Sequence, residues 1–289
     1  MTDQLLDPVG LTVIISGPAG SGKSTLMAQA YRSGTNPVWL SIHSTDNDPA
    51  VLWSAVTDAI APVIDGFGSS YRHLLRGPQP NVVKGIVPAA INELAQAEQP
   101  LTIFIDDVQL LENQECLASL ETFVQQRPES ITIVIAGRES PPLRLQRERL
   151  RGHLVEIRQG QLNMDAPEAR TMLEALDLHL DDDQLDRLLE HTEGWVAGLR
   201  WAAMALEKEP DIDWFLSSGA SPDGDIGRYL VEEVLRQQPE DQRAFMLETS
   251  VMRGLTADMC DAVRDCSDSG RRLEQLERSN AMVIGTDQG

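Results

Sequence analysis

Cysteine, basic residues and long apolar runs are all scarce in this 289-residue sequence. Cys116, Cys260 and Cys266 are odd in number and fit no zinc-site spacing, so we expect reduced thiols, with Cys260 and Cys266 in the core. No apolar run reaches the roughly 18 residues that a membrane helix needs. The first residues are polar and acidic, unlike a secretory signal. We therefore expect a cytoplasmic protein with no membrane partner.

Acidic residues outnumber basic ones by 45 to 24, which gives a net charge of −21. Because a nucleic-acid backbone requires a basic face on its partner, this balance argues against DNA or RNA binding by this stretch. The acidic residues are spread along the chain rather than gathered in a tail, which is typical of a solvated surface. Any positive field for a phosphate ligand must therefore be local.

A glycine-rich segment, GPAGSGKST at residues 17–25, fits the phosphate-loop pattern G-x-x-x-x-G-K-[ST]. A β-branched run at 11–16 precedes it, and helix-forming sequence at 25–31 follows it, which is the context that the motif requires. The alternative is a glycine-rich turn that binds nothing. The residues expected to surround a nucleotide's phosphates are Gly17, Pro18, Ala19, Gly20, Ser21, Gly22, Lys23, Ser24 and Thr25.

Each part of this loop suits a polyphosphate. The glycines permit the backbone dihedrals and the close approach, so that N–H groups can wrap the phosphates, and the following helix presents its positive dipole end. Lys23 is expected to reach the β- and γ-phosphates of ATP, and Ser24 to bind Mg²⁺ through its hydroxyl. Thr25 is a candidate contact to the α-phosphate.

Acidic and basic side chains follow two further apolar runs. The run at 101–105 ends in Asp106 and Asp107, where phosphate-loop proteins carry the Mg²⁺-associated aspartate. We assign Asp106 to the metal through water, and Asp107 as the candidate base or water-positioning group; the alternative is two surface acids. The run at 131–135 leads to Arg138, a candidate contact to the γ-phosphate. Its alternative role is an ion pair with Glu139 or a surface acid.

The remaining pattern predicts an α/β protein: a phosphate-loop fold with a five-stranded parallel sheet flanked by helices. Asp48 and Pro49 are expected to cap and begin a helix, with metal or phosphate binding by Asp46 and Asp48 as the alternative. Strands complete the sheet at 37–42 and 154–158, helices lie at 49–64, 81–98 and 115–126, and 66–80 forms a surface loop. Beyond 161 we expect helices at 165–176, 181–192, 194–208, 226–238, 239–250, 255–263 and 270–278, a linker at 209–225 and a strand at 281–285.

Several longer motifs resemble one family, the MalT-like regulators. These are large ATP-binding transcription activators of the LuxR class, within the STAND branch of the AAA+-related NTPases, and the resemblance covers nearly the whole chain. The motifs are WLS at 39–41 with DNDP at 46–49, GRESP at 137–141, LVEIR at 154–158, GWVAGL at 194–199, YLVEEVL at 229–235, FMLETS at 245–250 and LEQLERSN at 273–280.

The resemblance implies a nucleotide-binding domain at 1–160, a helical lid domain at 161–222 and a winged-helix module at 223–289, as a fragment of a longer protein. It also implies a switch: ADP holds an inactive monomer, ATP promotes self-association that activates transcription, and slow ATP hydrolysis resets the system. An inducer and DNA would bind regions outside this fragment. Lys23, Ser24, Asp106 and Arg138 occupy matching positions.

The sequence departs from the family pattern at two places. Val196 stands where the lid usually carries a proline that packs on the adenine, so a base contact there would be apolar only. The family's DDYH reads DDVQ at 106–109, which leaves open whether Gln109 positions water. Two other classes also remain open: a phosphate-loop small-molecule kinase or metabolic NTPase, although no acceptor pocket is marked, and a nucleotide-binding scaffold that never hydrolyses.

Overall fold

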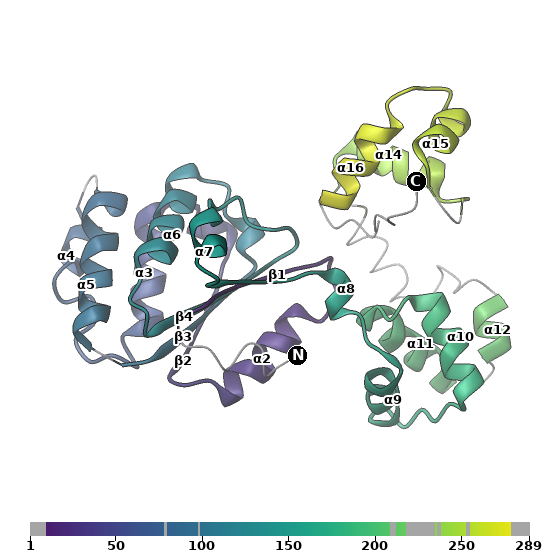
Figure 1. Cartoon of the computed structure of the whole chain (residues 1–289), viewed down its shortest axis with the longest axis horizontal. Helices are drawn as coiled ribbons and strands as arrows, with labels where there is room; N and C mark the ends of the chain where they lie inside the picture. Colours follow the sequence, from purple (N-terminus) through teal and green to yellow (C-terminus); the bar gives the residue numbers. More distant parts are fainter. Residues whose placement is uncertain are drawn as a thin grey trace. The chain divides into compact units, whose positions relative to one another are not determined.

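The computed structural model describes residues 10–77, 80–97, 99–208, 212–217, 235, 238–252 and 255–278. The chain divides into two compact units (Figure 1). The first consists of residues 1–16 and 23–158, and the second of residues 17–22 and 159–289. None of the described helices is long and apolar enough to cross a membrane.

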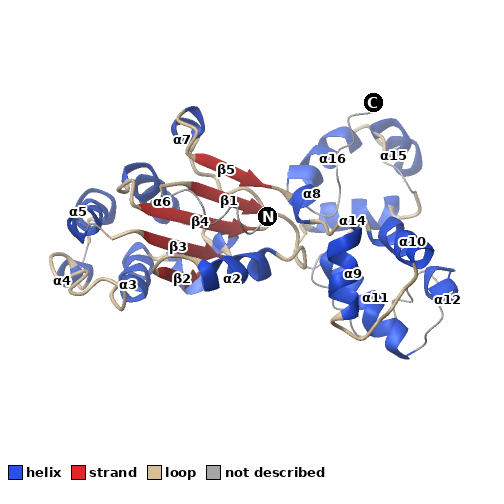
Figure 2. Ribbon diagram, turned by 60° about the horizontal axis from the view of Figure 1, so that its bottom comes forward, coloured by secondary structure: helices blue, strands red, loops and turns tan. Residues whose placement is uncertain are grey.

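A five-stranded parallel sheet forms the centre of the first unit, in the order β2-β3-β4-β1-β5 (Figure 2). All five strands lie where the sequence predicts them. Their bounds are β1 (Thr12–Ser16), β2 (Pro37–Ser41), β3 (Leu101–Asp106), β4 (Ile131–Gly137) and β5 (Leu154–Ile157). Every residue of β1, β3 and β4 is buried, as continuous apolar strands in a parallel sheet covered on both faces should be.

Helices cover both faces of this sheet. On one face, Ile14, Ile103 and Ile133 pack in one cluster with Trp53 and Phe123 from the helices. On the other, Tyr31 lies edge-on to Phe104, with ring centroids 5.8 Å apart. The helices of this unit are α2 (Lys23–Ser33), η1 (Ser44–Asn47), α3 (Pro49–Ile60), α4 (Arg72–Leu75), η2 (Val82–Ile86), α5 (Val87–Ala97), η3 (Val108–Leu110), α6 (Gln114–Gln126) and α7 (Gln146–Leu150).

Local sequence signals account for most of these boundaries. Asp48 caps α3, because its carboxylate accepts hydrogen bonds from the N–H groups of Ala50 and Val51 at 2.8 and 3.1 Å. Capping by Asp48, rather than ligand binding, is the arrangement that the structure supports. The helix predicted at 81–98 is present as a π-helical turn, η2, followed by α5.

The prediction of a surface loop at 66–80 is wrong in part. Phe67, Tyr71 and Leu75 are buried, and the short helix α4 begins at residue 72. The Tyr71 hydroxyl lies 3.1 Å from the hydroxyl of Thr57 in α3, which anchors the segment on the helix layer. The glycine and serine content of the segment signalled a loop, but burial of its three large side chains overrides that signal.

The described residues of the second unit form helices and connecting loops. Its helices are α8 (Gln159–Leu162), α9 (Ala166–Glu174), α10 (Asp182–Thr192), α11 (Val196–Lys208), α12 (Ile212–Ser217), α14 (Glu240–Thr249), α15 (Ala257–Arg264) and α16 (Ser269–Arg278). A core that includes Leu173, Leu188 and Leu199 joins α9, α10, α11 and α12. Phe245 and Cys260, together with Leu276, join α14, α15 and α16.

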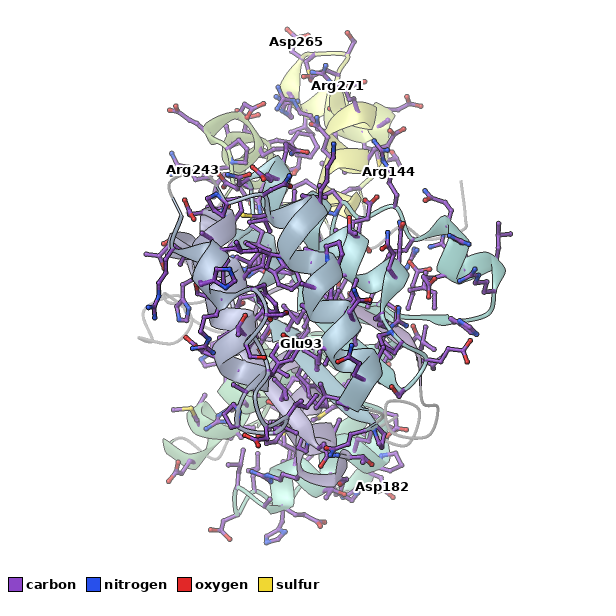
Figure 3. All side chains as sticks on the ribbon, turned by 90° about the vertical axis from the view of Figure 1, so that its left-hand side faces the viewer. Glu93, Arg144, Asp182, Arg243, Asp265 and Arg271 are labelled. Carbon is purple, nitrogen blue, oxygen red and sulfur yellow. The ribbon has the colours of Figure 1, made fainter. Side chains whose placement is uncertain are left out.

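Two of the predicted domain limits, 160 and 222, remain predictions. The limit at 222, the helix at 226–238, the linker at 209–225 and the strand at 281–285 fall almost entirely outside the described residues. Figure 3 labels charged side chains that point outward from the ribbon, as expected for a solvated surface. Exposed examples in that view are Arg144, Asp182, Arg243, Asp265 and Arg271.

Candidate functional site

The loop at residues 17–22 connects the end of β1 to the start of α2, as the phosphate-loop motif requires. Gly20 and Gly22 have φ angles of +74° and +87°, a region that side chains with a Cβ rarely adopt. The predicted loop residues differ in exposure. Buried are Gly17, Pro18 and Ser21, half-buried are Ala19, Gly22 and Lys23, and exposed are Gly20, Ser24 and Thr25.

Ser24 and Asp106, the two residues predicted to serve Mg²⁺, meet in the first unit. The Ser24 hydroxyl donates to Asp106 Oδ2 at 2.7 Å, and the Asp107 N–H donates to Asp106 Oδ1 at 2.9 Å. Asp106 is only 5% exposed, and both of its carboxylate oxygens accept hydrogen bonds. The carboxylate is therefore held in place at the carboxyl end of β3. Hydroxyl and carboxylate oxygens are the donors that Mg²⁺ prefers, so this pair fits that ion.

Lys23 lies in a partly dehydrated, charged environment. Burial lowers its pKa from 10.5 to about 8, while Asp106 raises that pKa, Arg138 lowers it and Asp107 raises it. These influences place the other three charged groups predicted for the site within electrostatic range of Lys23. The Lys23 ammonium remains positively charged at neutral pH, and a nearby anionic ligand would favour that charged form.

Asp107 and Arg138 are linked through a residue whose role the sequence left open. Gln109 Nε2 donates to Asp107 Oδ1 at 2.9 Å, and the Arg138 N–H donates to Gln109 Oε1 at 3.1 Å. Asp107 adopts the left-handed conformation, with φ 60° and ψ 34°. These two hydrogen bonds therefore connect the turn after β3 to the end of β4. The only sequence signal for Gln109 was its place in the DDVQ motif.

The start of α11 contacts the phosphate loop within the second unit. The Ala197 N–H donates to the Gly20 carbonyl at 3.0 Å. A Cβ built on Gly20 would lie 2.5 Å from the Ala197 Cβ, and one built on Gly22 would lie 3.3 Å from Val196 Cγ2. Val196 is thus adjacent to the loop, and its contact with a base remains a prediction. Ala197 and Trp195 were not identified from the sequence, although both belong to the GWVAGL motif.

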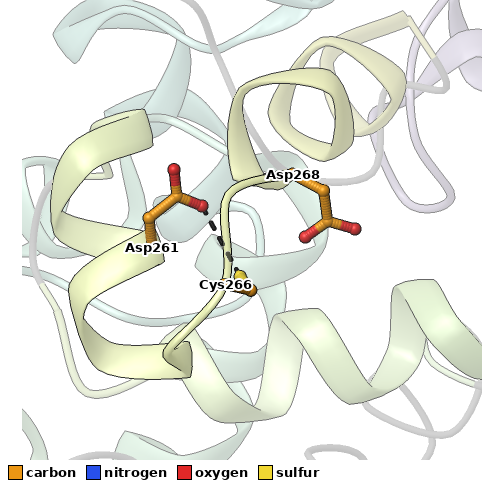
Figure 4. Close-up of side chains that lie close together, drawn as sticks. All are labelled: Asp261, Cys266 and Asp268. Carbon is orange, nitrogen blue, oxygen red and sulfur yellow. Dashed lines mark hydrogen bonds between the residues drawn. The ribbon is translucent and has the colours of Figure 1, made fainter.

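Another group of polar side chains, Asp261, Cys266 and Asp268, places its ligand-type atoms within 4.8 Å of one another (Figure 4). The Cys266 thiol donates to Asp261 Oδ1 at 3.5 Å. Arg272 Nε and Arg264 Nη1 donate to Asp268 at 2.7 and 3.1 Å, and the bond from Arg272 lowers the pKa of Asp268 to about 2. Because two guanidinium groups already neutralise Asp268, we assign this cluster to joining α15 with α16 rather than to a metal.

Comparison with known proteins places this geometry in context. Residues 231–289 match the family model described as the MalT winged helix domain. The HTH-type transcriptional regulator MalT of Yersinia enterocolitica is 28% identical to the chain over 278 residues, which is 95% of this chain and 31% of that protein. The regulator of the same description from Yersinia pestis gives the same identity and coverage. The chain therefore spans about a third of the length of the curated relatives that it matches.

One solved structure shows the fold. The Walker-type ATPase PABY2304 of Pyrococcus abyssi is similar with a TM-score of 0.59 and 13% sequence identity, over 96% of this chain and 87% of that one. The parallel sheet of this chain and the loop between β1 and α2 are those expected for an α/β phosphate-loop NTPase. The resemblance that the sequence motifs indicate is therefore confirmed: the chain has a phosphate-loop NTPase fold, it is similar along nearly its whole length to the MalT regulators, and residues 231–289 match the MalT winged helix model.

Proposed function

We propose that this chain is the nucleotide-dependent switch of a MalT-like transcriptional regulator, which binds ATP or ADP with Mg²⁺ and hydrolyses ATP slowly. The observation that carries the proposal is the 2.7 Å bond between Ser24 and Asp106, two side chains 82 positions apart in the sequence. A phosphate-loop serine and a strand-end aspartate in contact are the protein's half of a nucleotide–magnesium site. An aspartate with no role beyond the protein surface would be expected to face solvent instead of contacting the phosphate-loop serine.

Each candidate residue has its own role in the proposed nucleotide site. Main-chain N–H groups of the loop and the Lys23 ammonium bind the phosphate oxygens, and Ser24 and Asp106 hold the metal. Mg²⁺, when bound, supplies positive charge that neutralises the phosphate oxygens. Asp107 is exposed beside Asp106, and its carboxylate orients the attacking water or accepts its proton.

Arg138 gives the site a means of distinguishing the two nucleotides. It follows β4 and acts on Lys23 electrostatically, so its guanidinium belongs to the same charged group as the other candidate residues. A cation that binds the γ-phosphate stabilises only the ATP complex. We propose that this difference drives the switch, with the ATP form self-associating, and that an inducer and DNA bind other parts of the longer protein.

Substitution of Lys23 by alanine tests the nucleotide site. A hydrogen bond from a charged group contributes about 1.5–3 kcal/mol, so Lys23→Ala should weaken both ATP and ADP binding by roughly tenfold to more than a hundredfold. Isothermal titration calorimetry with Mg²⁺ present measures both affinities. Lys84→Ala is the matched control, because Lys84 is an exposed lysine of the same unit in η2.

The two variants must first be shown to be folded, by comparing their thermal unfolding with that of the unsubstituted chain. If Lys23→Ala retains native affinity for both nucleotides, the assignment of the loop is wrong. If Lys84→Ala loses as much affinity as Lys23→Ala, the loss reflects general charge rather than a specific phosphate contact.

A further inference from the structure

The side chain of Gln109 joins two groups that the proposed function places in different roles. Its amide nitrogen donates to the Asp107 carboxylate at 2.9 Å, and its amide oxygen accepts from the Arg138 N–H at 3.1 Å. A carboxylate can only accept and a backbone N–H can only donate, so both partners fix the orientation of the amide. A primary amide is the side-chain group that offers a donor and an acceptor at this spacing.

The surrounding backbone leaves Gln109 little freedom. Asp107 is held in the left-handed region, and the Leu110 N–H donates to the Asp107 carbonyl at 3.0 Å, which closes the tight turn η3. From the other side, Gly137 approaches closely: a Cβ there would lie 2.9 Å from Val108 Cγ1 and 3.3 Å from Gln109 Oε1. The amide therefore lies in a slot between the turn after β3 and the end of β4.

We propose that Gln109 is a positioning residue that couples Arg138 to Asp107, so that contact of Arg138 with a γ-phosphate sets the orientation of the carboxylate that acts on water. This inference rests on the proposed function, because it assigns Asp107 and Arg138 their roles there. The hydrogen bond from Gln109 takes one carboxylate oxygen and fixes the rotation of the group. A shift of the backbone at Arg138 would be transmitted to Asp107 through a single rigid amide.

Two substitutions separate the two hydrogen bonds. Gln109→Glu keeps an acceptor for the Arg138 N–H but removes the donor to Asp107 and places a like charge beside it. Gln109→Met keeps the length of the side chain and removes both hydrogen bonds. Gln114→Glu is the matched control for added charge, because Gln114 is exposed at the start of α6 in the same unit.

The expected results differ between the variants. In Gln109→Glu, kcat at saturating ATP should fall roughly tenfold or more, because the Asp107 carboxylate loses its orientation, while the ratio of ATP to ADP affinity stays within about twofold of the unsubstituted value. In Gln109→Met, kcat should fall similarly, and the affinity ratio should also decrease as Arg138 loses its anchor. Gln114→Glu should change neither quantity.

A double substitution tests whether Gln109 acts through Asp107. In the Asp107→Asn background, Gln109→Met should lower kcat no further, because the group that it orients is already disabled. Additive losses would show that Gln109 acts by another route. A purely structural role would lower thermal stability and both nucleotide affinities together, without separating kcat from binding.

One readout does not depend on nucleotide. By NMR, hydrogen exchange of the Arg138 amide in the nucleotide-free protein should become roughly tenfold faster in Gln109→Met and remain unchanged in Gln109→Glu. Full turnover with an unchanged affinity ratio in both Gln109 variants overturns the coupling while leaving the proposed function in place. An unsubstituted chain that takes up no nucleotide overturns the proposed function itself, and the coupling with it.

Discussion

Replacement of Arg127 by methionine should destabilise the central sheet of the first unit at the edge where β1 and β4 begin, which is opposite the edge that carries the candidate site. Arg127 follows α6, and its guanidinium donates to the carbonyl groups of Ile131, at the start of β4, and Gly10, just before β1, at 2.9 and 2.8 Å. It also donates to the Val124 carbonyl and lies 3.4 Å from Glu148 Oε2 in α7. The Arg127 side chain thus connects the segment before β1 to the start of β4. The phosphate loop follows β1, and Arg138 follows β4.

The loss in free energy of unfolding follows from the burial of the Arg127–Glu148 pair. The side chains of Arg127 and Glu148 are only 4% and 3% exposed, and burial lowers the pKa of Arg127, with Glu148 opposing that decrease. Removing one partner of a buried pair costs about 3–5 kcal/mol. Arg151 Nη1, 3.9 Å from Glu148 Oε1 and 46% exposed, would compensate the remaining charge only in part. The lost hydrogen bonds to the carbonyl groups add to that cost. Because small domains are stable by only about 5–15 kcal/mol in total, Arg127→Met should remove a large part of the stability of the unit.

The Glu148 carboxylate that remains after removal of Arg127 is the source of this cost, so removing it as well should relieve part of the loss. Arg127→Met combined with Glu148→Leu should cost less than Arg127→Met alone, because no buried charge is left behind.

Hydrogen exchange at the amides of β1 and β4 measures this local stability. The control is Arg149→Met, which breaks the pair between Arg149 and Glu156. That pair is shorter, at 2.7 Å, but its side chains are 57% and 27% exposed, so it should contribute at most about 1 kcal/mol. If Arg127→Met costs less than about 1 kcal/mol, or if Arg127→Met with Glu148→Leu costs more than Arg127→Met alone, the reasoning from burial is refuted.

Two more predictions concern the site itself. Gly20→Ala should weaken ATP binding and lower the unfolding temperature, because the added methyl group would lie 2.5 Å from the Ala197 Cβ in a backbone region that costs a non-glycine residue about 1–2 kcal/mol. Adding Ala197→Gly should restore part of the ATP affinity and part of the unfolding temperature. If the double variant loses as much of both as Gly20→Ala alone, the steric clash is excluded. Arg138→Ala should weaken ATP binding more than ADP binding in calorimetry, and equal losses would remove its role as a phosphate sensor.

Much of the fold could be predicted because its signals are local. Apolar runs predicted β1, β3 and β4, since a strand buried on both faces is apolar along most of its length, and shorter runs predicted the edge strands β2 and β5, which are partly exposed. Asp48 followed by Pro49 predicted the start of α3 to the residue, because a capping carboxylate and a proline without an N–H group suit the first turn. The meeting of Ser24 with Asp106 was also predictable, because a known motif fixes which strand must carry the acid.

The residues that were missed act through partners far away in the sequence. Beyond its place in DDVQ, Gln109 gives no sequence signal of its contacts, and its proposed role depends on Arg138, 29 positions later, bringing an N–H group to its oxygen. Ala197 reads as an ordinary helix residue until the Gly20 carbonyl is seen to accept from it, across 177 positions. Neither partner can be inferred from periodicity or composition, because a single hydrogen bond leaves no pattern in the chain. The loop glycine is therefore constrained from two sides, by the phosphates that it is proposed to wrap and by the start of α11, and only the first constraint is written in its motif.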